Sequence, residues 1–102
     1  MKSDFFKDKH WGLQEEWCLE QAKEQALAFD LIWEPRLEHW INGTRVFYEN
    51  YAHSPNMRAL VKHLQLTADP SATSTILHIT LKANPALVLS FLAGIPRPAQ
   101  CF

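Results

Sequence analysis

The positions of the prolines limit most strongly how this chain folds. Pro35 and Pro85 each precede an apolar run at helical spacing, and Ser54-Pro55 has the same form. Proline is favoured at the first position of a helix, because its fixed φ suits the helix and its missing N–H is not needed there. The prolines therefore predict helices that begin near residues 35, 55 and 85.

The last eight residues form an arm that cannot continue as a helix. Pro96 and Pro98 lack backbone donors and hold the residues before them in extended geometry. Gly94 is expected to close the preceding helix in the left-handed conformation. We therefore predict a domain over residues 1–94 and a semi-rigid arm over residues 95–102.

Apolar residues elsewhere recur every three or four positions, which is typical of helices. Helices are predicted for 14–29, 35–51, 55–64 and 85–92. Cys18 lies on the apolar stripe of the first helix with Ala22 and Ala26, so its thiol is expected to be buried. Residues 67–75 are predicted to form a polar loop. Residues 76–81 are compatible with a strand or a short helix, because β-branched residues interrupt the period.

The segment 35–51 carries an aromatic set that includes Trp40, Phe47 and Tyr51. Its spacing indicates a core face rather than a surface on which nucleic-acid bases stack. Gly43 stands in the middle of the segment, where glycine costs a helix about 1 kcal/mol relative to alanine. This position is therefore expected to mark a kink or a close contact between two elements.

Composition excludes several functional classes. The chain has 102 residues, 47% of them hydrophobic, which predicts a single folded domain. Its formal net charge of −1 means that it lacks the positive field that attracts nucleic acid or anionic membranes. No apolar run of about 18 residues and no export signal are visible. We therefore expect a cytoplasmic protein that binds no membrane. Its two cysteines are expected to be free thiols, and a disulfide between Cys18 and Cys101 is the alternative. Zinc-ligand spacings are absent, so no metal or cofactor is predicted.

Two segments carry a resemblance to a known family. Residues 93–102 read A-G-I-P-R-P-A-Q-C-F, and residues 48–62 read Y-E-N-Y-A-H-S-P-N-M-R-A-L-V-K. They resemble the A-G-L-P-K-P-x-x-C-[VI] ending and the Y-x-x-Y/F-x-x-S/A-P-x-x-R-x-L-x-K segment of the DsrC/TusE family. These are small sulfur-carrier proteins related to the gamma component of dissimilatory sulfite reductase. His39-Trp40 matches a further family pair.

The resemblance implies an α+β fold that is predominantly helical. It has about five helices, a reduced N-terminal β-meander and an extended C-terminal arm. This chain departs from the family in its shortened N-terminal region and over residues 81–90. Partner surfaces in those two regions are therefore not carried over.

The resemblance also implies the chemistry of the arm. Family members of the DsrC type have a second arm cysteine at the position of Ser90, whereas TusE-type members have only the penultimate cysteine, as here. The implied function is a sulfur relay, at most a sulfurtransferase activity, in which Cys101 accepts a persulfide sulfur. In TusE-type members the donor is the TusBCD complex and the acceptor is the tRNA 2-thiouridylase MnmA.

Three cations are candidates for contacts with the arm or with a partner. Arg97 is the cation nearest to Cys101 in sequence and favours its thiolate, which the C-terminal carboxylate opposes. Arg58 and Lys62 are one helical turn apart in the second family segment. They are expected either to hold the arm or a partner, or to form an ordinary solvated helix face.

Two alternative functions remain within the same family. Residues 52–55 form a tight turn between two predicted helices, so the chain is compatible with a regulatory or adaptor protein that binds DNA. The net charge of −1 argues against direct binding to a nucleic acid. The other alternative is a protein associated with sulfite reductase, and Ser90 argues against its two-cysteine cycle.

Overall fold

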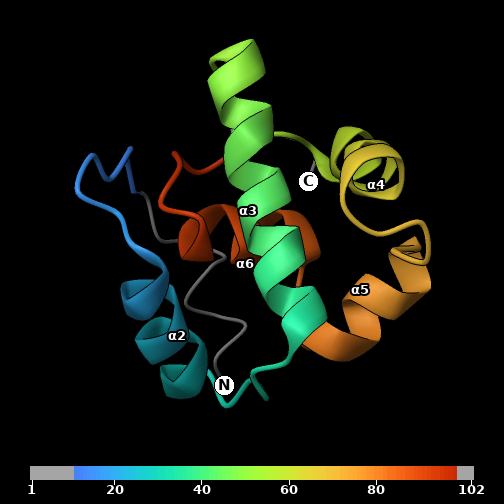
Figure 1. The fold of residues 1–102 in the computed structure, drawn as a ribbon, viewed down its shortest axis with the longest axis horizontal. Coiled ribbons are helices and arrows are strands. Elements are labelled where there is room, and N and C mark those ends of the chain that lie inside the picture. Colours follow the sequence, from blue (N-terminus) through green and yellow to red (C-terminus); the bar gives the residue numbers. More distant parts are fainter. Residues whose placement is uncertain (1–10, 99–102) are drawn as a thin grey trace.

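The protein is described by a computed structural model over residues 11–98, and this part contains five helices. These are α2 (Leu19–Ala28), α3 (Pro35–Tyr51), α4 (Met57–Thr67), α5 (Ser74–Leu81) and α6 (Pro85–Leu92). Figure 1 shows α6 behind α3 at the centre, with α2 on one side and α4 and α5 on the other. The prediction of a predominantly helical chain is confirmed.

The central helix, α6, contacts each of the other four helices of the described part. Seven of its eight residues are buried, as expected for a helix that is apolar all round. Asn84 caps it, because its side-chain oxygen accepts from the N–H groups of Ala86 and Leu87 at 3.0 and 3.3 Å. The predicted start at Pro85 and end at Leu92 are both confirmed.

The predicted β-meander is not found, since residues 11–98 contain no strand. The segment before α2 lies instead along the segment after α6. Gln14 N–H donates to the Gly94 carbonyl at 2.7 Å, and Arg97 N–H donates to the Trp11 carbonyl at 3.2 Å. Pro96 has no N–H, so these contacts cannot continue as a regular ladder. The α+β class is therefore wrong for the described part of the chain.

The first predicted helix begins later than expected, and this changes the position of Cys18. Helix α2 begins at Leu19, and Cys18 is its extended N-cap residue, with φ −143°. The thiol is exposed and free, so the prediction of a buried packing residue is wrong. Ala22 and Ala26 are buried as predicted. The helical period that relates Cys18 to them does not apply before the helix begins.

Helix α4 also begins two residues later than the Ser54-Pro55 pair predicts. Asn56 is its N-cap, with its side-chain oxygen accepting from Ala59 N–H at 2.9 Å. The Ser54 hydroxyl instead donates to the carbonyl of Pro96, so it is not available to cap the helix. Ser54 therefore contacts the arm, which is distant in sequence, and does not cap α4.

The ambiguous segment 76–81 is helical. Helix α5 begins after Thr73, whose hydroxyl accepts from Ile76 N–H at 3.2 Å. Leu77 and Leu81 are buried, whereas Ile79 is 68% exposed, as the two sides of a helix require.

Gly43 lies where α3 packs closely against the last part of α4. A Cβ at this position would lie 2.8 Å from Leu64 Cδ2 and 3.3 Å from Ala68 Cβ, so the predicted close contact is confirmed. Trp40 and Phe47 are buried on the same helix as expected. Tyr51 is 57% exposed, because it is the last residue of α3 and extends beyond the packed part of the helix.

The helices were compared with the length and apolarity that a membrane span requires. No single helix among residues 11–98 has the length and apolarity to cross a bilayer. Helices α5 and α6 taken together have the length and composition of a membrane span, but the chain bends by 64° between them.

Asp69 stabilises the loop between α4 and α5 against the core. Its carboxylate accepts from the Ser71 hydroxyl at 2.6 Å, from Ser71 N–H at 3.0 Å and from Trp40 Nε1 at 2.9 Å. These bonds, the Ser71 hydroxyl first, hold the pKa of Asp69 below its usual value of 3.8. The carboxylate is therefore favoured in the folded state.

Asp69→Asn is expected to lower the free energy of unfolding at pH 7 by about 1 kcal/mol, because hydrogen bonds to a charged acceptor are lost. Between the lowered folded pKa and the usual value of the unfolded chain, the unfolded chain binds more protons, so stability rises with pH. The contribution is therefore complete above the unfolded pKa and is lost as pH falls through the folded one. Urea unfolding at several pH values should show the two proteins converging in acid. Glu49→Gln, at an exposed position of α3, is the matched control.

Candidate functional site

The site is built where α6 ends and the arm begins. Gly94 has φ +71°, its N–H donates to the Phe91 carbonyl at 3.2 Å, and Ile95 N–H donates to the Ser90 carbonyl at 3.1 Å. These two bonds form a Schellman motif, which ends the helix and directs the chain away from its axis. The predicted left-handed residue at Gly94 is confirmed.

Trp17 packs on the backbone of this turn. A Cβ on Gly94 would lie 2.5 Å from Trp17 Cδ1, so only glycine leaves room for the indole. The indole Nε1 also donates to the Leu92 carbonyl at 2.7 Å. One tryptophan therefore both covers the turn and satisfies a carbonyl at the helix end, where carbonyls lack helical partners.

Arg45 holds the same turn from α3. One terminal guanidinium nitrogen donates to the Ala93 carbonyl at 2.7 Å, and the guanidinium carbon lies 4.7 Å from the centre of the Trp17 ring. A cation at a helix C-terminus is favoured by the partial negative charge there. The stacked guanidinium thus links α3, the N-terminal segment and the start of the arm.

Arg45→Met is expected to lower the free energy of unfolding by about 1–2 kcal/mol, since it keeps an unbranched side chain near Trp17 but removes the donor and the cation. Urea denaturation measures this loss. Amide hydrogen exchange at Gly94 and Ile95 should accelerate as well. Arg45→Lys should recover only part of the stability, because an ammonium lacks the planar stacking surface. An unchanged midpoint in Arg45→Met would show that the stacked arginine is not needed.

The first residues of the arm are attached to the domain. Ile95 is fully buried, and its carbonyl accepts from Trp11 Nε1 at 2.9 Å. The next carbonyl, that of Pro96, accepts from the Ser54 hydroxyl. Pro98 is also buried. The arm is therefore packed against the domain as far as Pro98, and at Pro96 it lies beside Ser54, which precedes α4.

The candidate residues from the sequence fall in different places. Cys101 lies outside the described residues. Arg97 is half-buried beside Trp11, to which its backbone N–H donates. Arg58 and Lys62 are exposed on α4, where they line one groove together, and Arg97 does not line it.

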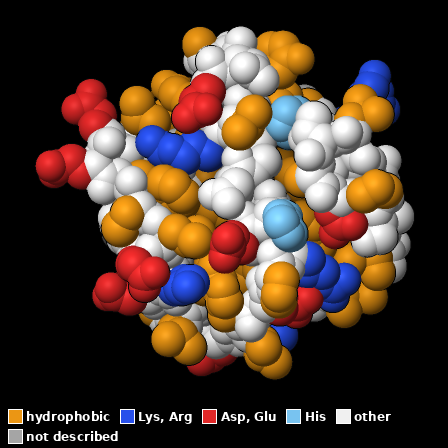
Figure 2. All heavy atoms as spheres, in the orientation of Figure 1, with side chains coloured by type: hydrophobic (Ala, Val, Ile, Leu, Met, Phe, Trp, Pro, Cys, Tyr) orange, Lys and Arg blue, Asp and Glu red, His pale blue; other side chains and the backbone are white. Residues whose placement is uncertain are grey.

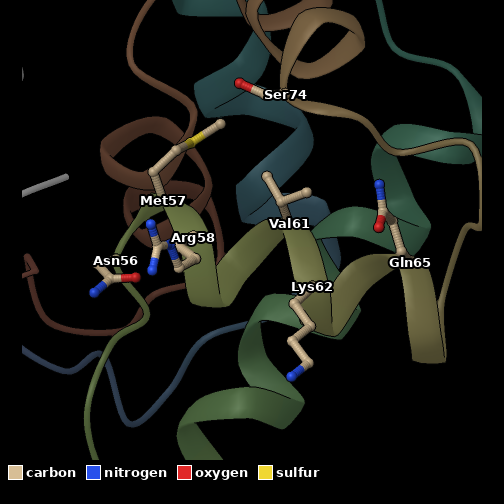
Figure 3. Close-up of a pocket in the computed structure, with 7 residues that line it drawn as sticks. All are labelled: Asn56, Met57, Arg58, Val61, Lys62, Gln65 and Ser74. Atoms are coloured by element: carbon tan, nitrogen blue, oxygen red, sulfur yellow. The ribbon is translucent and has the colours of Figure 1, made fainter.

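That groove, which we call the α4 groove, has a volume of about 730 Å³. It is lined by Asn56, Met57, Arg58, Val61, Lys62, Gln65 and Ser74. Figure 3 shows Met57 and Val61 on the side of α4 that faces Ser74, with Arg58 near the beginning of the helix. Apolar and cationic side chains thus share one surface depression. No group of acidic, histidine or cysteine side chains suited to a metal ion occurs among residues 11–98.

Sequence reasoning missed the residues that hold the arm, which are Trp11, Trp17, Arg45 and Ser54. Two of the contacts join residues 75 and 84 positions apart, and no local spacing indicates such pairs. Ser54 was singled out in the sequence, but as the predicted N-cap of a helix and not as a residue that contacts the arm. Ser90, at the position of the second family cysteine, is fully buried in α6.

A family model described as DsrC-like protein matches residues 5–102. Among curated relatives, the chain is 33% identical over 89 residues to the sulfurtransferase TusE of Buchnera aphidicola subsp. Schizaphis graminum, covering 84% of this chain and 76% of that protein. It is 30% identical over 97 residues to the sulfurtransferase TusE of Salmonella choleraesuis, covering 92% of this chain and 89% of the relative.

Solved structures are similar in fold. The NMR structure of DsrC from Allochromatium vinosum matches with a TM-score of 0.76 and 25% identity, over 89% of this chain and 85% of that one. The crystal structure of the oxidized gamma-subunit of dissimilatory sulfite reductase (DsrC) from Archaeoglobus fulgidus matches with a TM-score of 0.68 and 27% identity. That match covers 86% of this chain and 82% of the other.

Proposed function

This chain belongs to the DsrC-like protein family, and we propose that it is a sulfur carrier, which receives a persulfide sulfur on Cys101 and passes it to an acceptor. The proposal rests mainly on the family match, which extends through the penultimate cysteine of the arm. The names of the two relatives as sulfurtransferases support the same chemistry.

The proposed reaction is an exchange at sulfur in two steps. The Cys101 thiolate attacks the terminal sulfur of a donor persulfide, the donor S–S bond breaks, and the donor leaves as a thiolate. Cys101 then carries one additional sulfur as a persulfide. In the second step a thiolate of the acceptor attacks this terminal sulfur and the Cys101 S–S bond breaks. The acceptor then carries the persulfide and Cys101 leaves as a thiolate, so the transfer needs no external oxidant or reductant.

The thiol needs help to react at neutral pH. A free cysteine has a pKa of about 8.5, so only a few per cent is thiolate near pH 7. We propose that Arg97 favours the thiolate and that Arg58 and Lys62 contact the arm or a partner. The partner's own active site completes the activation, since a carrier serves two different reactions.

We propose a TusBCD-like complex as the donor and an MnmA-like tRNA 2-thiouridylase as the acceptor. The basis is the similarity to two proteins named TusE. Such a relay operates in the cytoplasm, where thiols remain reduced. A buried serine at position 90 does not support the two-cysteine cycle of a sulfite-reductase partner.

The relay is tested by following one sulfur atom from donor to acceptor. The protein is loaded with ³⁵S from a persulfide donor, separated from it and mixed with a reduced MnmA-type enzyme, ATP and unmodified tRNA. The thiols of the reduced enzyme supply the two electrons that convert persulfide sulfur to the thiocarbonyl, and a disulfide forms there. Radioactive 2-thiouridine is the expected product. Loading without transfer to tRNA would contradict this acceptor. Salt-dependent binding of the unloaded protein to a DNA duplex would favour the regulatory alternative instead.

A further inference from the structure

Helix α4 carries two rows of side chains along the α4 groove. Met57 and Val61 are half-buried, and the exposed cations Arg58 and Lys62 directly follow them in sequence. Residues four positions apart on a helix lie on the same face at about 6 Å, so the two members of each row are neighbours. An apolar row and a cationic row therefore run side by side at this surface.

The cationic row is not neutralised by acids of the described chain. Neither Arg58 nor Lys62 forms an ion pair with another of residues 11–98. Residues 51–102 contain four Lys or Arg but one Asp or Glu, and that acid, Asp69, is held by hydrogen bonds in the loop after α4. Figure 2 shows acidic side chains gathered on the side where the N-terminal segment and α2 lie, away from α4. The groove therefore attracts an acidic ligand from another molecule.

The length of the groove favours a helical ligand over a small anion. Its lining extends from Asn56 to Gln65, which is about 14 Å along α4. A single carboxylate or phosphate would meet the cations but leave the apolar row uncovered. An amphipathic helix covers both rows, because its own side chains recur at the same spacing. When an apolar residue is followed by an acid every four residues, a helix antiparallel to α4 brings both rows against their counterparts.

A ligand in the groove lies next to the described part of the arm. The Ser54 hydroxyl donates to the Pro96 carbonyl, and Ser54 is only two positions before Asn56, where the groove lining begins. A protein bound along α4 is therefore held beside the arm.

We propose that the α4 groove binds an acidic amphipathic helix of a partner protein. Carboxylates of that helix pair with Arg58 and Lys62, and its apolar side chains pack on Met57 and Val61. The inference rests on the proposed sulfur-carrier function only in making the partner a member of the relay. Binding here raises the effective concentration of the partner's active site near the arm and leaves the sulfur chemistry itself unchanged.

Titration of the full-length, ¹⁵N-labelled protein with model peptides tests the groove. The probe is a capped peptide of about 16 residues that repeats Leu-Glu-Ala-Gln, which is long enough to form a helix when bound. Amide shifts are expected over residues 56–65 and at Ser74. A Leu-Ala-Glu-Gln peptide has the same composition with its acids on another side of the helix, and a Leu-Gln-Ala-Gln peptide has no acids. Both should bind about five-fold more weakly, because two exposed ion pairs are lost.

The variant with Arg58→Gln and Lys62→Gln should lose the same five-fold and should no longer distinguish the first peptide from the one without acids. Lys82→Glu changes the net charge by an equal amount at an exposed position outside the groove, and it should bind as the wild type does. Amide spectra verify the fold of each variant.

Equal binding of the three peptides to the wild type would overturn the proposal, as would the absence of shifts over α4. Shifts over α4 that depend on protein concentration without any peptide would also overturn it, because a second copy would then occupy the groove. No sulfur donor is present in this titration, and persulfide loading of Cys101 is measured without peptide. The proposed docking and the proposed sulfur-carrier function can therefore fail separately.

Discussion

Cys101→Ser is expected to abolish persulfide loading completely. The wild-type protein, incubated with a protein persulfide donor and analysed by intact mass, should gain about 32 Da for one added sulfur atom. A serine hydroxyl remains protonated at neutral pH and cannot attack the donor S–S bond, so the variant should gain nothing. The loss is total because the proposed chemistry has a single nucleophile.

Cys18→Ser is the matched control for this experiment, because Cys18 is also an exposed free thiol. It should load as the wild type does. Equal loading of the wild type and Cys101→Ser would contradict the sulfur-carrier function. Loss of loading in Cys18→Ser with retention in Cys101→Ser would move the function to the N-cap of α2. Peptide mapping after alkylation identifies the modified residue directly.

Gly94→Ala is expected to lower the free energy of unfolding by about 3 kcal/mol. Two costs add, since alanine is strained at φ +71° and its Cβ would lie 2.5 Å from Trp17 Cδ1. The indole must move, and its bond to the Leu92 carbonyl is then weakened. Urea denaturation monitored by far-ultraviolet circular dichroism measures the loss.

Gly12→Ala is the control, because a Cβ there meets no atom within 4 Å. Its unfolding midpoint should be nearly that of the wild type. If Gly94→Ala is as stable as Gly12→Ala, the tight contact with Trp17 is not a determinant of the fold. A destabilised Gly94→Ala protein should also show faster exchange at the Ile95 amide, since the Schellman turn supports the arm.

Helices were predictable where a local signal has no competitor. Asn84-Pro85 and Gly94 are cap, first-turn and terminator residues, and each acts within one helical turn. Ser54-Pro55 has the same local form, yet the Ser54 hydroxyl binds the Pro96 carbonyl and the helix begins after Asn56. A capping signal fails when a distant acceptor competes for the same side chain.

The chemistry at Cys101 stays a prediction from the sequence. The penultimate cysteine and the alternating prolines indicate an extended arm with one reactive thiol. The exposure of Cys18 was not predicted, because the helical period of the apolar residues does not show at which residue the helix begins. The absence of a β-meander from residues 11–98 was not predicted either, because a resemblance to a family does not show which of its elements are shortened in this chain. Both depend on how residues 11–18 pack against the end of α6.

The sequence by itself determined the bounds of the helices that begin at Pro35 and Pro85, the left-handed turn at Gly94 and the single cysteine of the arm. These properties follow from backbone geometry and capping, which act over a few residues. Only the tertiary structure decided that Trp11, Trp17 and Arg45 hold the beginning of the arm, and that Ser74 of α5 lines the same groove as Arg58 and Lys62 of α4. Such contacts join residues far apart in the chain, so they arise only when the whole core packs.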